Sequence, residues 1–135
     1  MIRFFNEDID FNLPYKQEVK KWLRHIIIAE GKRVGEVSVI FCSDEYLRQM
    51  NRRYLQHDYY TDIITFDYTE DEMISGDLFI SIDTVKANAE EYKQTFEKEL
   101  HRVMAHGALH LCGYNDATPQ EQKAIREAED KYLNE

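Results

Sequence analysis

Apolar side chains recur at two different spacings along the chain. Between Pro14 and Glu30 they fall three or four residues apart, which is the period of an amphipathic helix. Between Val34 and Phe41 they alternate with other residues, which is the period of a half-buried strand. The two periods predict helices and strands in mixed order along the chain.

The whole chain is predicted to form about four strands and five helices. Local signals mark the helix starts, because Ser, Thr and Asp side chains cap the first turn and Pro fits its first position. Tyr54 and Ala124 are predicted to face the interior. The expected strands are 2–5, 34–41, 62–67 and 76–82, with an acidic turn at 68–75; the expected helices are 14–30, one capped by Ser43, one capped by Asp83 or Thr84, one from about Thr95 to Cys112, and one opened by the Thr118–Glu121 capping box.

This pattern predicts a small sheet with helices packed against it, which is an α+β or α/β layer architecture, without determining the strand order. The length of 135 residues suits one domain, 1–135, and aromatic residues make up 13%, too much apolar surface for a disordered chain. No apolar run is long enough to span a bilayer, and the first residues do not resemble a secretory signal. Two cysteines do not form a disulfide framework, so the expected location is the reducing cytoplasm.

The net charge of −9 is unevenly distributed. Residues 1–66 hold ten basic and ten acidic side chains, whereas residues 67–135 hold seven and sixteen. This acidity argues against broad, non-specific binding to nucleic acid. Two basic stretches, 14–33 and 46–57, still allow a local basic groove, although they also suit the solvated faces of two helices.

The segment that points to chemistry runs from His106 to Asp116. His106 and His110 are four residues apart on a predicted helix, so their Cβ atoms lie ~5–6 Å apart on one face. Gly113 ends that helix, and the chain then turns so that Asp116 can supply a carboxylate oxygen. Two imidazoles and one carboxylate leave a tetrahedral Zn²⁺ one open position, which is typical of a catalytic site.

Each of these residues also has a simpler interpretation. A His-x-x-x-His pair on a helix is common without a metal, and Asp116 could cap the last helix, although Thr118 suits that role better. His25 and His101 are interpreted as ordinary surface or core histidines, and Cys112 as a small buried hydrophobe. Zinc peptidases carry a glutamate general base after the first histidine, where this chain has Gly107.

Three blocks of residues together resemble the YbeY-type endoribonucleases, also called rRNA maturation factors. The hallmark His-Gly-x-Leu-His-Leu-x-Gly-Tyr-Asp-His is matched up to Tyr114. A second block, Asn-x-x-Tyr-Arg-x-x-Asp-x-x-Thr-Asp-Val-Leu-Ser-Phe, and a third, Gly-Asp-Ile-x-Ile, are matched in order. The matching residues are His106, Gly107, Leu109, His110, Leu111, Gly113 and Tyr114; Asn51, Tyr54, Asp58, Thr61, Asp62 and Phe66; and Gly76, Asp77 and Ile80.

The resemblance implies a zincin-like α+β fold and a zinc-dependent endoribonuclease that cuts single-stranded RNA. It implies a role in maturing the 3′ end of small-subunit rRNA and in ribosome quality control, with rRNA and the small ribosomal subunit as partners. One Zn²⁺ per chain would be held by His106, His110 and Asp116. The candidates for RNA contact are Lys20, Lys21, Arg24, Arg52 and Arg53.

Two positions depart from the family pattern. Asp116 stands where the family has its third histidine, which keeps three ligands but adds a negative charge. Leu55 stands where the family has an arginine thought to serve activity, and Arg52 or Arg53 on the same helix could compensate. A non-catalytic, metal-containing assembly factor and a zinc peptidase are therefore kept as alternatives, and the attacking nucleophile, the metal in the cell, the cleavage site and the oligomeric state stay open.

Overall fold

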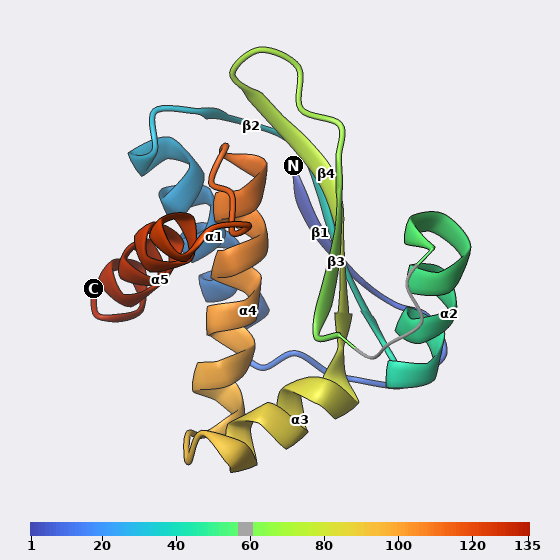
Figure 1. Ribbon diagram of the computed structural model, residues 1–135. Helices are drawn as coiled ribbons and strands as arrows, with labels where there is room; N and C mark the ends of the chain where they lie inside the picture. Colours follow the sequence, from blue (N-terminus) through green and yellow to red (C-terminus); the bar gives the residue numbers. More distant parts are fainter. Residues whose placement is uncertain (57–60) are drawn as a thin grey trace.

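Four strands form one sheet in the spatial order β1-β2-β4-β3, and five helices surround it (Figure 1). The computed structural model describes residues 1–56 and 61–135. The predicted α+β class and the number of elements are confirmed. The strands are β1 (Ile2–Asn6), β2 (Arg33–Cys42), β3 (Ile63–Asp67) and β4 (Met73–Ser81); the helices are α1 (Lys16–Ala29), α2 (Asp44–Leu55), α3 (Ile82–Glu91), α4 (Phe96–Leu111) and α5 (Pro119–Leu133).

The sheet is mixed, because three of its strands are parallel and one edge strand is antiparallel. β1 pairs with β2 and β2 pairs with β4 in parallel, whereas β3 pairs with β4 in antiparallel fashion. The short connection from β3 to β4 permits an antiparallel pair, while the parallel pairs are joined by crossovers that contain helices. The antiparallel β3 lies at the edge of the sheet, where it borders the candidate site.

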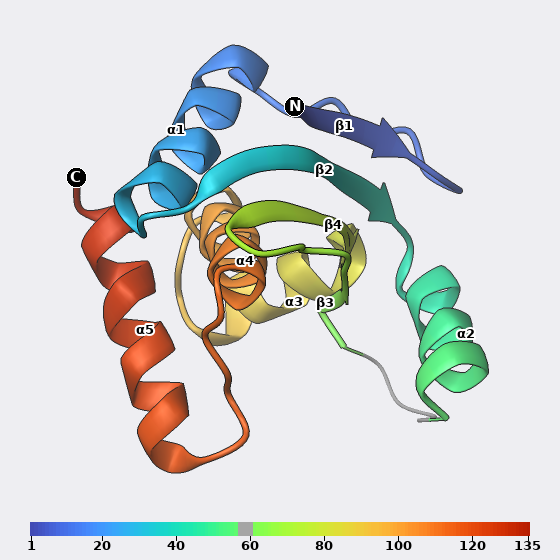
Figure 2. The same cartoon turned by 90° about the horizontal axis from the view of Figure 1, so that it is seen from above.

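The two faces of the sheet are covered very differently. On one face Val39, Leu78 and Ile80 belong to the main core, together with buried residues of α1, α3, α4 and α5. On the other face a small cluster of Cys42, Leu47 and Ile64 packs under α2. Figure 2 shows α1 and α2 at opposite ends of the molecule. None of the described helices combines the length and the apolar character needed to cross a bilayer.

Gly107 of α4 packs directly against the sheet. A Cβ atom on this residue would lie 2.8 Å from the Ile63 Cδ1 atom and 2.9 Å from the Leu78 Cδ1 atom. Such distances are too short for carbon atoms, so a larger residue would require the ends of the Ile63 and Leu78 side chains to move. The residue that directly follows His106 therefore faces the sheet and lines neither of the cavities at the histidines, so a general base is not placed there.

The helix caps at Ser43 and Thr118 are confirmed, and Thr118 and Glu121 form the predicted capping box. The helix α4 begins close to its predicted start, with Thr95 as its cap. The prediction for α3 was wrong by two or three residues, because Ser81 caps it and the helix follows β4 directly. β4 also begins at Met73 instead of Gly76, because a tight turn at Glu70–Met73 lets pairing start earlier.

Two residues predicted to face the interior are exposed. On α2 the inner positions are Leu47 and Asn51, which leaves Tyr54 57% exposed beside Phe66. On α5 the inner stripe passes through Ile125, Glu129 and Tyr132, so Ala124 lies outside it. In both helices a polar residue occupies the inner face where an apolar one was expected.

The end of α1 is tied to the loop after α4 and to α5. Glu30 accepts hydrogen bonds from the Tyr114 hydroxyl at 3.0 Å and from the Tyr132 hydroxyl at 2.5 Å. The Trp22 Nε1–H group donates to the Tyr132 carbonyl oxygen at 3.2 Å. These bonds fix the position of Tyr114, and with it the start of the loop that carries Asp116.

Candidate metal centre

His106 and His110 lie on one face of α4 and line the same cavity, as their spacing predicted. The cavity has a volume of about 270 Å³ and opens between α4, β3 and the end of α2. Asp116, which follows α4, lines it as well. The remaining lining residues are Asn51, Leu55, Thr61, Asp62, Ile63, Ile64 and Thr65.

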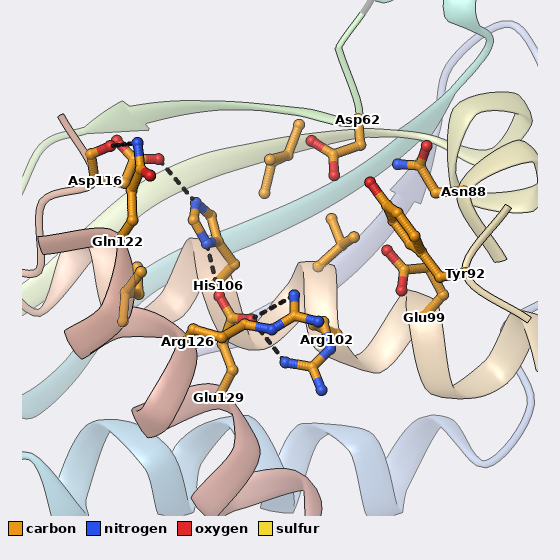
Figure 3. Close-up of a pocket in the computed structure, with 13 residues that line it drawn as sticks. Asp62, Asn88, Tyr92, Glu99, Arg102, His106, Asp116, Gln122, Arg126 and Glu129 are labelled. Atoms are coloured by element: carbon orange, nitrogen blue, oxygen red, sulfur yellow. Dashed lines mark hydrogen bonds and ion pairs between the residues drawn. The ribbon is translucent and has the colours of Figure 1, made fainter. Parts of the chain in front are cut away.

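The ring of His106 is held between two carboxylates. Its Nδ1 atom lies 2.8 Å from the Glu129 Oε2 atom on α5, and its Nε2 atom lies 3.4 Å from the Asp116 Oδ2 atom (Figure 3). A ring that donates from Nδ1 to a carboxylate keeps the lone pair on Nε2. This is the arrangement found in metal-binding histidines, whose second nitrogen is fixed by a hydrogen-bond acceptor.

The ring of His110 is fixed by the backbone that follows its own helix. Its Nδ1 atom lies 2.9 Å from the Tyr114 carbonyl oxygen, which can only accept a hydrogen bond. Gly113 makes this return possible, because its φ angle of 112° lies in the region that favours glycine. His110 is thus also left with a lone pair on Nε2.

Glu129 was not identified from the sequence, although it is central to the site. Its side chain is only 4% exposed, and its Oε1 atom lies 3.0 Å from the Arg102 Nη1 atom on α4. Arg102 also pairs with Asp130 at 2.8 Å. The sequence did contain a signal, because Glu129 lies on the inner face of α5 between Ile125 and Tyr132. An unpaired charge there would be costly, so a partner on a neighbouring helix was to be expected.

Burial and charge change the proton affinity of several groups here. Burial raises the pKa of Asp62, although the nearby His106 opposes this. Burial and the charge of Asp62 raise the pKa of Glu99. Burial lowers the pKa of His106, but the hydrogen bond and charge of Glu129 outweigh it, so the net pKa is raised. Such shifts cluster at functional sites.

The donor chemistry of His106, His110 and Asp116 fits a divalent ion, because two imidazole nitrogens and a carboxylate are ligands that Zn²⁺ accepts. Asp116 lies on the loop before α5 with its side chain 51% exposed. Within residues 1–56 and 61–135, however, no three His, Cys, Asp or Glu side chains are gathered closely enough to form a ready-made metal cage. The two imidazoles and their supports are in place, and Asp116 contacts one of them.

The candidates for RNA contact are divided between the two sides of the molecule. Lys20, Lys21 and Arg24 lie on α1, whereas Arg52 and Arg53 lie on α2. In the described structure, none of the five lines the cavity at the histidines. Leu55 does line it, so at this position the α2 side presents hydrocarbon. Asp58, which belongs to the second sequence block, falls outside the described residues.

His25, His101 and Cys112 have surroundings unlike those of the pair. His25 is exposed and contacts Glu135 at 2.6 Å, and His101 lies against Trp22 with a ring separation of 5.4 Å. Burial lowers the pKa of His101, which favours its neutral form. Cys112 packs partly buried against the core, and burial raises its pKa to about 12.

These features define an α+β protein with paired imidazoles and a carboxylate beside a surface cavity. The chain belongs to a known family of this class, because the family model described as Endoribonuclease YbeY matches residues 2–135. A relative from Phocaeicola vulgatus named Endoribonuclease YbeY is 53% identical over 133 residues, which cover 98% of this chain and 96% of the relative. One from Bacteroides thetaiotaomicron with the same name is 54% identical over 118 residues, covering 87% and 86%.

A solved structure has the same fold as this chain. The solution structure of a Thermotoga maritima protein matches with a TM-score of 0.71 and 32% identity, covering 99% of this chain and 87% of that one. The predicted family membership and fold class are therefore confirmed. The relatives are named for endoribonuclease activity, which agrees with the enzyme class predicted from the sequence.

Proposed function

We propose that this chain is a metal-dependent endoribonuclease that cuts single-stranded RNA, with 1–135 as one hydrolase domain. Its substrate is rRNA, at the 3′ end of the small-subunit molecule, and it acts in the cytoplasm in ribosome maturation and quality control. One Zn²⁺ is held by His106, His110 and Asp116. The names of the relatives support the RNA-cleaving activity, and the donor chemistry supports the metal.

One observation carries the metal assignment. Both His106 and His110 have an acceptor at Nδ1, so both keep a lone pair on Nε2, and both line one cavity. A pair of buried core histidines would not need this matched orientation. Asp116, close to the His106 Nε2 atom, then supplies an oxygen and a negative charge.

A divalent ion at this site would supply Lewis acidity, which polarises a phosphoryl oxygen or lowers the pKa of a water molecule to ~7. The chain's own residues do the rest. Glu129 orients His106 and increases its basicity, and the Tyr114 carbonyl does the same for His110. Arg102 balances the charge of Glu129, so that this carboxylate stays in place inside the protein.

The ligand assignment is tested by replacing one histidine at a time. His110→Ala should lose bound zinc, measured by elemental analysis, and should lose cleavage of a single-stranded RNA. The matched control is His25→Ala, which removes an exposed histidine far from the cavity and should keep both properties. Unchanged metal content in His110→Ala contradicts the assignment.

The alternative of a zinc peptidase is disfavoured by Gly107, because the position after His106 carries no glutamate base and faces the sheet. Assaying the same preparation on a peptide library and on single-stranded RNA separates the two activities. The alternative of a non-catalytic assembly factor gains weight from Leu55. Full rescue of rRNA processing in cells by a stable, metal-free variant would favour it over the enzyme.

A further inference from the structure

A second, larger cavity adjoins the histidine site on the side away from Leu55. It has a volume of about 390 Å³, within the range of small-ligand pockets, and it lies between α3, α4 and α5. Asp62, Ile63, His106 and Asp116 line both cavities, so the two are continuous. A chain of nucleotides that reaches the histidines therefore has space to continue into it.

Two guanidinium groups lie on the α4 and α5 walls of this larger cavity. Arg102 and Arg126 both approach the Glu129 Oε1 atom, with Nη1 atoms at 3.0 Å and 3.9 Å (Figure 3). Glu129 uses its other oxygen for His106. The Glu129 Oε1 atom is thus shared between two guanidinium groups, and it lies within hydrogen-bond distance of Arg102 alone.

The two arginines are not equivalent. Arg102 has a side chain only 14% exposed and binds Glu129 and Asp130 at hydrogen-bond distance. Arg126 is 60% exposed, and the one ion pair it makes within the described residues is too long for a hydrogen bond. Its donors therefore remain available to a ligand at the mouth of the cavity.

On this basis, and resting on the proposed function, we infer that Arg126 contacts a phosphate of the RNA next to the scissile one. Guanidinium groups bind phosphate through paired, charge-assisted hydrogen bonds. The carboxylates of Asp62 and Glu99 line the same cavity, so the phosphate stays at the mouth, where Arg126 is exposed. Arg126 then provides a cation on α5, across the site from Leu55 on α2.

The same cavity offers a surface for a base. Tyr92 is 55% exposed and lies on the side of the cavity away from His106, near the Asn88 amide (Figure 3). Bases of single-stranded RNA stack on such rings with little regard to sequence. The structure therefore assigns Arg126 to a phosphate and Tyr92 to the neighbouring base.

The test compares Arg126→Gln with Lys123→Gln, which removes an exposed cation of the same helix that does not line the cavity. Binding of a labelled 2′-O-methyl RNA oligonucleotide is measured by fluorescence anisotropy over a range of salt, and KM and kcat are measured with the RNA itself. Arg126→Gln should raise Kd and KM about tenfold and leave kcat within about twofold, because it removes one charge-assisted contact. Its salt slope should fall by ~0.7, the value for one phosphate on a single strand.

Lys123→Gln should match the wild type in all of these measurements. Equal losses in both variants, or none in Arg126→Gln, overturn the assignment of Arg126. Loss of bound zinc in Arg126→Gln also overturns it, because the residue would then act through Glu129. A wild-type chain that neither binds nor cuts the RNA overturns the proposed function together with this inference.

Tyr92 is tested in the same binding assay by two substitutions. Tyr92→Phe should bind like the wild type, because the ring that stacks is kept. Tyr92→Leu should bind about tenfold more weakly, in line with the loss of one stacked base. Equal affinity of Tyr92→Leu and Tyr92→Phe contradicts the stacking assignment.

Discussion

His106 and His110 lie one helical turn apart on α4, but their rings are held by different kinds of partner. His110 is held by the Tyr114 carbonyl, four residues further along the chain. His106 is held by Glu129, twenty-three residues further along and on another helix. One end of the site is therefore built locally, while the other depends on the docking of α5. The two ends should respond differently to mutation.

The largest effect is expected for the distant support. Glu129→Ala should lower zinc affinity 10- to 100-fold, because His106 loses the partner that orients it. It should also lower the free energy of unfolding by about 3 kcal/mol, because Arg102 loses one partner in a mostly buried position. Metal titration and urea denaturation measure the two effects. Normal zinc affinity would show that His106 needs no support from α5.

A smaller effect is expected where α4 meets the sheet. Gly107→Ala should lower the free energy of unfolding by about 1 to 2 kcal/mol, because its Cβ atom forces the ends of Ile63 and Leu78 to move, which costs more than the gain in helix propensity. The control is Glu127→Ala on the exposed face of α5, which gains no overlap and should leave the free energy of unfolding within about 0.5 kcal/mol. A Gly107→Ala variant as stable as the wild type would mean that α4 does not lie as close to β3 as described.

The support of His110 is the backbone carbonyl of Tyr114, so it should tolerate a change in the Tyr114 side chain. Tyr114→Phe removes the hydroxyl that donates to Glu30 but leaves the carbonyl that holds His110. Zinc affinity should stay within about twofold, while the free energy of unfolding falls by about 1 kcal/mol. A drop in zinc affinity as large as that of Glu129→Ala would remove the distinction between the two ends.

The smallest effect concerns the thiols. Burial raises the pKa of both Cys42 and Cys112 to about 12, so both stay protonated in the folded protein at mildly alkaline pH. Because the thiolate is the reactive form, labelling by a maleimide should be slow until the protein is unfolded. Rapid labelling of Cys112 in the native state would show that the end of α4 opens, which would loosen the His110 side.

The same contrast explains what could be predicted from the sequence. Ser43 and Thr118 were identified as caps because a cap acts within one turn. The histidine pair was found because its spacing is that of the helix itself. From Gly107 the sequence showed only that a glutamate base is missing. Its packing against the sheet was not predicted, because that contact joins segments far apart in the chain.

Long-range features were missed for a physical reason. Glu129 faces α4 only because α5 docks with one particular stripe inward, and the pattern of Ile125, Ala124 and Ala128 permitted more than one stripe. The basic helices α1 and α2 lie at opposite ends because of the strand order, which local periodicity does not encode. Helix spacing supplied the histidine pair and the family resemblance supplied the activity, whereas the groups that hold the two rings were seen only in the structure.

Trp22 makes the docking of the last helix observable. It is the single tryptophan of the chain, and its indole N–H is bonded to the backbone of α5 at Tyr132. Its fluorescence therefore reports whether α5 is in place, at a distance from the histidines. An emission spectrum recorded during a zinc titration separates loss of the ion from detachment of the helix, without any label.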